Sequence, residues 1–200
     1  MSRTSDARRG RLIVLAGPSG VGKSSIVAAL RERLPGLFFS VSATTRAPRA
    51  GEVDGRDYLF VGNAGFDRLV EHGELLEWAE IHGGLQRSGT PRAPVEDALA
   101  AGRPVLVEVD LQGARSLKTA LPDAVTVFVE PPSVAELERR LRQRGTESPE
   151  AFARRLQTAR EELAARDEFD VALVNRDVGE VVDRLVELMA GKNPLTGVTE

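Results

Sequence analysis

The sequence predicts an α/β fold in which helices flank a central parallel sheet. Short apolar runs rich in β-branched residues recur along the chain, as expected for strands that are buried on both faces. Segments with apolar residues at helical spacing lie between or after these runs, and this alternation is typical of a parallel sheet. The core strands are expected at residues 12–16, 105–110, 125–129 and 171–174.

The first strand leads into a helix. Apolar residues recur at helical spacing from Ile26 to Leu34, where Pro35-Gly36 ends the pattern, so a helix is expected over residues 23–34. Three further helices are expected near residues 133–143, 149–166 and 178–190.

The segment between the first two core strands has a different pattern of apolar and polar residues. From Phe38 to about Val61, short apolar pieces are interrupted by Thr, Arg, Pro and Gly, which is typical of small antiparallel strands and turns. A helix near residues 65–72 and an alanine-rich helix around 94–101 are expected to follow. We therefore predict an inserted lobe over residues 38–101.

Composition and charge are those of an ordinary globular protein. Of the 200 residues, 42% are hydrophobic and 28% are charged. The chain has no cysteine, which excludes disulfides and zinc–thiolate sites and indicates a reducing compartment such as the cytoplasm. A net charge of −3 and a pI of about 5.6 argue against binding to duplex nucleic acid. The two histidines, His72 and His82, have no metal-ligand spacing.

Both ends of the chain are expected to be flexible tails around one domain at residues 11–190. Residues 1–10 are basic and polar, and the apolar run Leu12–Ala16 after them is too short for a secretory signal or a membrane span. Residues 191–200 contain Gly, Pro and Thr without apolar periodicity. No membrane partner is therefore expected.

The segment Gly17–Ser24 has the pattern G-x-x-x-x-G-K-[ST] between a predicted strand and a predicted helix, which is the context of a phosphate-binding P-loop. Its glycines let backbone N–H groups turn toward an anion, Lys23 neutralises phosphate charge, and Ser24 can ligate magnesium. The sequence therefore predicts binding of a nucleoside triphosphate, although switches, motors and kinases all use this loop. The expected contacts are Gly17, Pro18, Ser19, Gly20, Val21, Gly22, Lys23, Ser24 and Ser25.

A second group of polar residues lies in the predicted lobe. Arg46 and Arg49 stand three residues apart among several hydroxyl residues, and Tyr58 follows shortly after. Planar guanidinium forks suit a phosphate monoester, because each contact is charge-assisted and can be bidentate. Taken alone, the cluster also fits a solvated polar strand.

Charged residues at two further places are candidate site residues. Glu108 and Asp110 end the second core strand, where ligands gather in an open α/β sheet, and Asp110 is the candidate for the magnesium side, through water. An arginine-rich stretch from Arg139 to Arg155 suggests two helices over the site, with Arg140 and Arg144 on one face. Taken alone, these features also fit surface acids and a solvated helix pair.

The stretch SVSATTRAPRAGEVDGRDYLF at residues 40–60, together with the P-loop, resembles the guanylate kinase family of bacterial type, and the likeness covers roughly residues 10–190. The resemblance implies Mg-dependent transfer of the γ-phosphate of ATP to GMP, giving ADP and GDP, with dGMP as a further acceptor, in purine metabolism and GMP recycling. It also implies a P-loop kinase fold with a mixed α/β GMP-binding lobe at 38–101 and a helical lid at 133–166. The core would comprise residues 11–37, 102–132 and 167–190.

The resemblance further implies roles for individual residues. Glu77 would select guanine, because a carboxylate can accept from N1–H and N2–H₂ together and adenine does not offer this pair; taken alone, it fits an exposed position. Asn175 would lie near the adenine of ATP. The GMP-binding residues would be Ser42, Arg46, Arg49, Tyr58, Glu77, Ser88, Glu108 and Asp110. The catalytic residues would be Lys23, Arg140, Arg144 and Arg155, and the magnesium ligands Ser24 and Asp110.

One segment departs from the family pattern. Many members have Gly-Asn-Tyr-Tyr-Gly where residues 83–87 read GGLQR, so Gln86 replaces a phosphate-binding tyrosine and Arg87 is a candidate substitute. Three alternative functions stay open: a P-loop kinase for another phosphorylated small molecule, a GTPase-type switch, and a non-catalytic guanylate-kinase-like module that binds phosphopeptides. The intact Lys23-Ser24 pair counts against the last of these.

Overall fold

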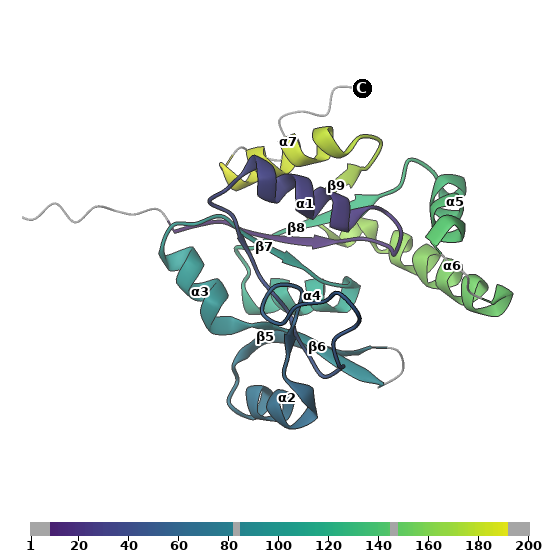
Figure 1. Ribbon diagram of the computed structural model, residues 1–200. Helices are drawn as coiled ribbons and strands as arrows, with labels where there is room; N and C mark the ends of the chain where they lie inside the picture. The colour runs from purple at the N-terminus through teal and green to yellow at the C-terminus, as the bar shows by residue number, and fades with distance from the viewer. Residues whose placement is uncertain (1–8, 82–84, 145–147, 192–200) are drawn as a thin grey trace, which may run out of the picture.

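The structure is a computed structural model, and it describes residues 9–81, 85–144 and 148–191. A five-stranded parallel sheet in the order β2-β7-β1-β8-β9 forms its core (Figure 1). The predicted parallel sheet with flanking helices is therefore confirmed. The strands are β1 (Leu12–Ala16), β2 (Phe38–Phe39), β7 (Val105–Glu108), β8 (Val125–Glu130) and β9 (Val171–Val174).

Helices cover both faces of this sheet, which explains why its central strand is continuously apolar. Leu15 of β1 packs in the cluster with α1 and α7, whereas Val14 packs on the opposite face with α3 and α4 (Figure 1). All five residues of β1 are buried. The helices are α1 (Lys23–Arg33), α3 (Arg92–Ala100), α4 (Leu111–Ala120) and α7 (Val178–Met189).

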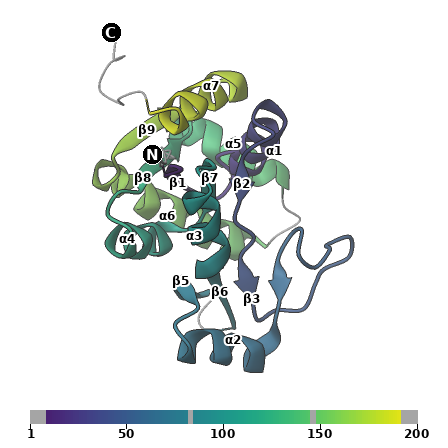
Figure 2. The same cartoon turned by 90° about the vertical axis from the view of Figure 1, so that its left-hand side faces the viewer.

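A second sheet, in the order β4-β3-β6-β5, forms a lobe that lies below the core in Figure 2. β3 and β5 each pair antiparallel with β6, while β3 and β4 are parallel. Phe66 of α2 is fully buried and packs in one cluster with Ala43 and Leu75 of this sheet. The elements are β3 (Ala43–Thr44), β4 (Leu59–Phe60), α2 (Gly62–Glu71), β5 (Leu75–Ile81) and β6 (Gln86–Pro91).

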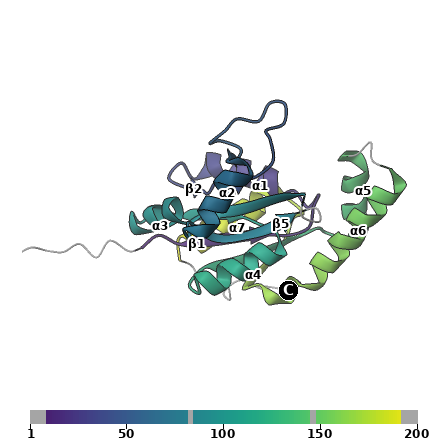
Figure 3. The same cartoon turned by 90° about the horizontal axis from the view of Figure 1, so that it is seen from below.

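Two helices, α5 (Val134–Arg144) and α6 (Pro149–Ala164), project from one end of the core (Figure 3). They pack against each other around Leu137, Leu141 and Ala159, which form a small cluster of their own. A short 3₁₀ helix, η1 (Arg166–Glu168), then leads into β9. The helices α5, α6 and α7 lie where the sequence predicts them.

Four features differ from the sequence prediction. β2 falls within the predicted lobe but pairs with β7 at the edge of the core sheet, because a two-residue strand is too short to show a period. α3, also inside the predicted lobe, packs on the core through Val95 and Leu99. The pairing of β3 and β4 is parallel rather than antiparallel. The sequence does not predict α4, because its buried face consists only of Gly113, Ala114 and Leu117.

The predicted tails fall largely on residues 1–8 and 192–200, which lie outside the described part of the chain. Gly10, however, donates its backbone N–H to the carbonyl of Leu99 at 2.8 Å, so this residue is attached to α3. None of the described helices combines the length and the apolar character needed to cross a bilayer.

Candidate active site

A cavity of about 760 Å³ opens where the loop after β1, the end of β7 and the lobe meet. The predicted triphosphate loop and the predicted arginine cluster line this same cavity. Val21, Ser25, Arg140, Arg155 and Asn175 are not among its lining residues. The predicted residues that line it are Gly17, Pro18, Ser19, Gly20, Gly22, Lys23, Ser24, Ser42, Arg46, Arg49, Tyr58, Glu77, Ser88, Glu108 and Asp110.

The loop between β1 and α1 is packed tightly on the core. Gly17 and Gly22 have φ values of 146° and 105°, which L-residues with a side chain rarely adopt. A Cβ atom at Gly17 would lie 2.3 Å from the carbonyl oxygen of Val129 in β8. Val21, between the two glycines, is fully buried in the core cluster, so the loop is anchored at its middle.

Two side chains hold the backbone of this loop from outside the cavity. Asn175 donates Nδ2–H to the carbonyl of Val21 at 2.8 Å, and Arg140 donates to the same oxygen at 3.1 Å. Asn175 is only 3% exposed, and its own N–H donates to the carbonyl of Glu130. The structure thus shows Asn175 supporting the loop, and its contact with adenine stays a prediction.

The start of α1 is open to an anion. No side chain of the described residues caps this helix, and its first turn contains no acid, so the helix dipole favours a negative ligand there. Lys23 begins the helix and donates its ammonium to the carbonyl of Gly17 at 2.6 Å. Ser24, the next residue, is exposed and lines the cavity.

The two projecting helices reach the same loop. Arg155 of α6 donates to the hydroxyl of Ser19 at 3.1 Å. Arg140 of α5 is held by Glu136 at 2.8 Å, and hydrogen bonds from Arg139 and Arg140 lower the pKa of Glu136 to about 2. Arg144 ends α5, and its side chain lies outside the described part of the structure.

Glu162 of α6 is a cavity residue that the sequence analysis misses. Burial raises the pKa of its carboxyl, while the positive charge of Lys23 and a hydrogen bond from the N–H of Ser19 oppose this shift. Its position depends on how α6 packs across the loop. Within a polar helix, no local pattern distinguishes Glu162 from its neighbour Glu161.

Glu77 is a buried carboxylate on β5. It is 8% exposed, so the exposed alternative is wrong, and it accepts a hydrogen bond from the hydroxyl of Thr90 at 2.6 Å. Burial raises the pKa of Glu77, the Thr90 hydrogen bonds oppose this shift, and the negative charge of Asp110 adds to it. Ser88 lies on the neighbouring strand β6 and lines the same cavity as Glu77.

Glu108, the last residue of β7, and Asp110, two residues further on, have different surroundings. Burial raises the pKa of Glu108, and the charge of Lys23 opposes this shift. Asp110 is exposed and caps α4, with Oδ1 accepting from the N–H of Gly113 at 2.8 Å. Oxygen donors such as Asp110 and Ser24 suit magnesium, which needs few direct protein ligands. The described residues contain no cluster of three or more candidate metal ligands, so a closed metal cage is absent there.

Arg46 is the most firmly held side chain of the lobe cluster. Its guanidinium forms two hydrogen bonds with the carboxylate of Glu52, at 2.6 and 2.7 Å. It also lies over the rings of Tyr58 and Phe60, at 4.6 and 5.4 Å from their centroids. Glu52 in addition accepts the backbone N–H of Arg49 at 2.7 Å, a contact that the sequence analysis did not assign to it.

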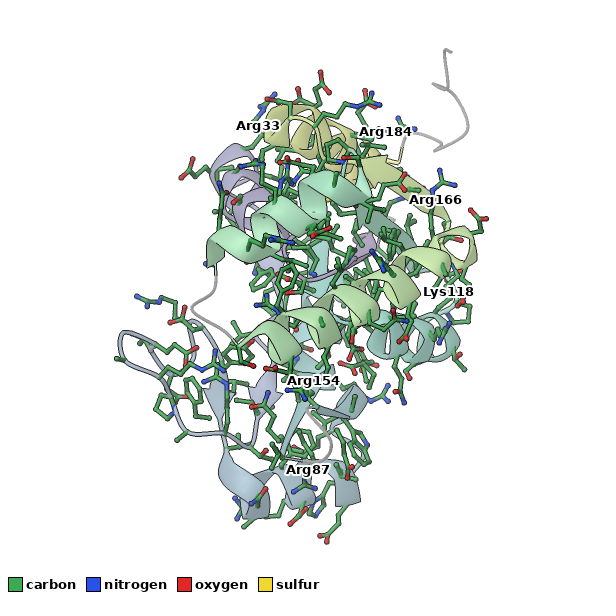
Figure 4. All side chains as sticks on the ribbon, turned by 90° about the vertical axis from the view of Figure 1, so that its right-hand side faces the viewer. Arg33, Arg87, Lys118, Arg154, Arg166 and Arg184 are labelled. Carbon is green, nitrogen blue, oxygen red and sulfur yellow. The ribbon has the colours of Figure 1, made fainter. Side chains whose placement is uncertain are left out.

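Gln86 and Arg87 lie on opposite faces of β6. Gln86 lines the cavity with Ser88, two residues further along the strand. Arg87 instead pairs with Asp67 at 2.7 Å and lies over the ring of Phe66, beside α2 (Figure 4). The structure thus does not bring Arg87 into the cavity, and of these two residues only Gln86 lines it.

The tight fit of the loop gives a first prediction. In Gly22→Ala, the added Cβ would lie 2.6 Å from Nδ2 of Asn175 on a left-handed backbone, so the free energy of unfolding should fall by about 1–3 kcal/mol. In the control Gly36→Ala, the methyl group meets no heavy atom within 4 Å, and the change should stay within about 0.5 kcal/mol. Urea denaturation measures both, and equal losses would contradict the tight fit.

Comparisons with known proteins agree on one family. The family model described as guanylate kinase matches residues 9–192. The guanylate kinase of Nocardia farcinica is 65% identical, with 93% of this chain and 96% of the relative covered. That of Rhodococcus jostii is 63% identical, with 92% and 89% covered.

Solved structures give the same answer. The crystal structure of guanylate kinase from Anaplasma phagocytophilum has a TM-score of 0.75 and 34% identity, with 94% of this chain and 89% of that chain covered. A shikimate kinase from Bacteroides thetaiotaomicron has a TM-score of 0.51 at 18% identity, covering 90% and 98%, which shows a shared fold alone. From its sequence, its fold and these relatives, the chain belongs to the guanylate kinase family.

Proposed function

We propose that this chain transfers the γ-phosphate of ATP to GMP, forming ADP and GDP. One observation carries the proposal: the triphosphate loop, the arginine cluster and the buried Glu77 line a single cavity. A triphosphate switch has no need of a second anion site, and a phosphopeptide module has no need of Lys23 and Ser24 beside it. The lack of cysteine fits a cytoplasmic setting.

The donor nucleotide would bind at the start of α1. Backbone N–H groups of the loop and the ammonium of Lys23 would hold its phosphates, while Arg46 and Arg49, with Tyr58 and Ser42, would hold the acceptor phosphate. Ser24 and, through water, Asp110 would hold Mg²⁺, which supplies positive charge to the phosphates when bound. Both phosphate groups would then face each other across the cavity.

The chemical step requires position and charge more than a protein nucleophile. An oxygen of the GMP phosphate forms a bond to the γ-phosphorus, and the bond from that phosphorus to the β–γ bridging oxygen of ATP breaks. The lobe would act as the GMP-binding unit and α5–α6 as a lid. Closure of the lid would bring Arg140, Arg144 and Arg155 to the transferring group and exclude water.

We assign guanine selection to Glu77, with Ser88 and Glu108 as further residues that line the same cavity. Each carboxylate oxygen has two lone pairs, so the hydrogen bond from Thr90 leaves Glu77 able to accept from N1–H and N2–H₂ of guanine. Adenine presents an acceptor at N1 and lacks this pair of donors, so it would leave the buried carboxylate without the two hydrogen bonds from the base, which is costly.

A coupled assay with GMP, dGMP, AMP, UMP and CMP tests the proposed function. We expect turnover with GMP, slower or comparable turnover with dGMP, and little with the others. Lys23→Ala should abolish transfer with the fold retained, and Lys118→Ala, at an ion pair with Asp170 outside the cavity, is the matched control. Rapid use of AMP without use of GMP, or retained turnover in Lys23→Ala, would refute the assignment.

Replacement of Arg46 by lysine should separate the two substrates. The ammonium keeps the charge but loses the planar fork, so we expect KM for GMP to rise about 10- to 100-fold, as for one lost charge-assisted hydrogen bond. KM for ATP should change little. Arg115→Lys, at the Arg115–Glu168 pair outside the cavity, is the control. Equal increases in both KM values would contradict the role in GMP binding.

At low pH, the dependence of kcat/KM for GMP on pH should reflect protonation of Glu77. Only the ionised carboxylate offers two full acceptor oxygens to N1–H and N2–H₂ of guanine, and burial raises the pKa of Glu77 above its ordinary value of 4.5. Lowering the pH through this raised pKa should therefore reduce kcat/KM for GMP, at a higher pH than an exposed glutamate would. This decline at low pH should disappear in Glu77→Gln and persist in Glu108→Gln, which removes the half-buried carboxyl whose pKa is also raised. An unchanged decline in Glu77→Gln would show that another group titrates.

A further inference from the structure

Glu52 is attached to both arginines of the lobe cluster. Its Oε2 accepts from Nη1 of Arg46 at 2.6 Å and its Oε1 from Nη2 at 2.7 Å, which is a bidentate pair. The backbone N–H of Arg49 donates to Oε2 at 2.7 Å. The Arg46–Glu52 pair is shielded, with 14% and 21% of the two side chains exposed. Three hydrogen bonds thus connect one carboxylate to the residues proposed to hold the acceptor phosphate.

These hydrogen bonds use one edge of the guanidinium. Nη1 donates to Glu52 and also to the carbonyl of Ala47 at 3.1 Å, so both of its hydrogens are engaged. Nη2 donates one hydrogen to Glu52. The other edge of the fork consists of Nε–H and the second hydrogen of Nη2, and this pair has the spacing that a phosphate accepts bidentately. Arg46 lines the cavity together with Tyr58, which is a further hydrogen-bond partner of its guanidinium.

The orientation of the Arg46 guanidinium is fixed in two ways. The rings of Tyr58 and Phe60 hold the plane of the guanidinium, and Glu52 holds its rotation within that plane. Hydrogen bonds from Arg46 and Arg49 lower the pKa of Glu52 to about 2, so the carboxylate is charged at any neutral or mildly acidic pH. Losing Glu52 would free the guanidinium to rotate without removing any positive charge.

We infer that Glu52 is a positioning residue. It binds Nη1 and Nη2 of Arg46, and it thereby orients Nε–H and the second hydrogen of Nη2 toward the acceptor phosphate. The inference rests on the proposed function. A different reading is that Glu52 competes with the phosphate and must be displaced from Arg46. The hydrogen bond from the backbone N–H of Arg49 favours the first reading, because it holds the carboxylate in place independently of the guanidinium. The two readings predict opposite effects on GMP affinity.

The experiment compares Glu52→Gln with the unaltered chain by calorimetric binding of GMP and by KM for each substrate. The amide has the same shape but only one acceptor oxygen, so the fork loses a partner. We expect the Kd and KM for GMP to rise about tenfold or more and KM for ATP to change less than about twofold. Glu168→Gln is the matched control, because it disrupts the bidentate pair with Arg115 outside the cavity.

A double-mutant cycle with Arg46→Lys shows whether Glu52 acts through Arg46. In the Arg46→Lys background, Glu52→Gln should change the Kd for GMP by less than about twofold. Lysine has no planar guanidinium that Glu52 could orient. A purely structural role would instead give the same loss in both backgrounds, with parallel losses for ATP.

Three results would overturn the inference. They are tighter GMP binding in Glu52→Gln, equal losses for GMP and ATP, and fully additive effects of the two substitutions. Each of them leaves the proposed function intact, provided that the unaltered chain binds and uses GMP. A chain that neither binds nor uses GMP would refute the proposed function and this inference together.

Discussion

The close contact between the glycine loop and the neighbouring strand β8 is the constraint on which the site depends. Gly17 lies against the backbone of Val129 where no side chain fits, and Val21 is buried in the core. The loop is therefore part of the packed interior, and its backbone has the conformation that only glycine adopts at low cost. Because the loop is fixed to β1 and β8, the start of α1 and the ammonium of Lys23 are fixed relative to the acids at the end of β7.

Several Arg and Lys side chains lie around this fixed loop, and each has a carboxylate nearby. Arg46 is paired with Glu52 and Arg140 with Glu136, while Lys23 lies near Glu108 and Glu162. Each partner reduces repulsion between like charges and fixes the direction of a flexible side chain. A phosphate group with two charges, bound as proposed, would meet donors that are already oriented, so less side-chain entropy would be lost on binding.

The sequence predicts the parts of the fold that depend on neighbouring residues. The strand, loop and helix at residues 12–34 follow from a local motif and a local apolar pattern. The parallel pairing of β3 with β4 and the edge strand β2 do not, because they depend on partners far along the chain. α4 is missed because a helix that packs through Gly113 and Ala114 needs few large apolar residues.

Residue types and motif positions identify most of the cavity lining, but not the contacts within it. Glu77 and Asp110 occupy the expected cavity, whereas the support of Val21 by Asn175 is visible only in three dimensions. Glu162 has no signal in the sequence, since its place depends on the angle at which α6 crosses the loop. Glu52 lies within a recognisable motif, but its hydrogen bonds with Arg46 are visible only in the structure.

The carbonyl of Val21 accepts two hydrogen bonds, and the two donors differ in how deeply they are buried. The donor on Asn175 is buried with the core, whereas the donor on Arg140 belongs to a half-buried side chain of α5. If α5 swings, the arginine can exchange this acceptor for a phosphate oxygen, and the amide alone still satisfies the carbonyl. The loop would then keep its conformation, and a movement of α5 would leave the packing of the core unchanged.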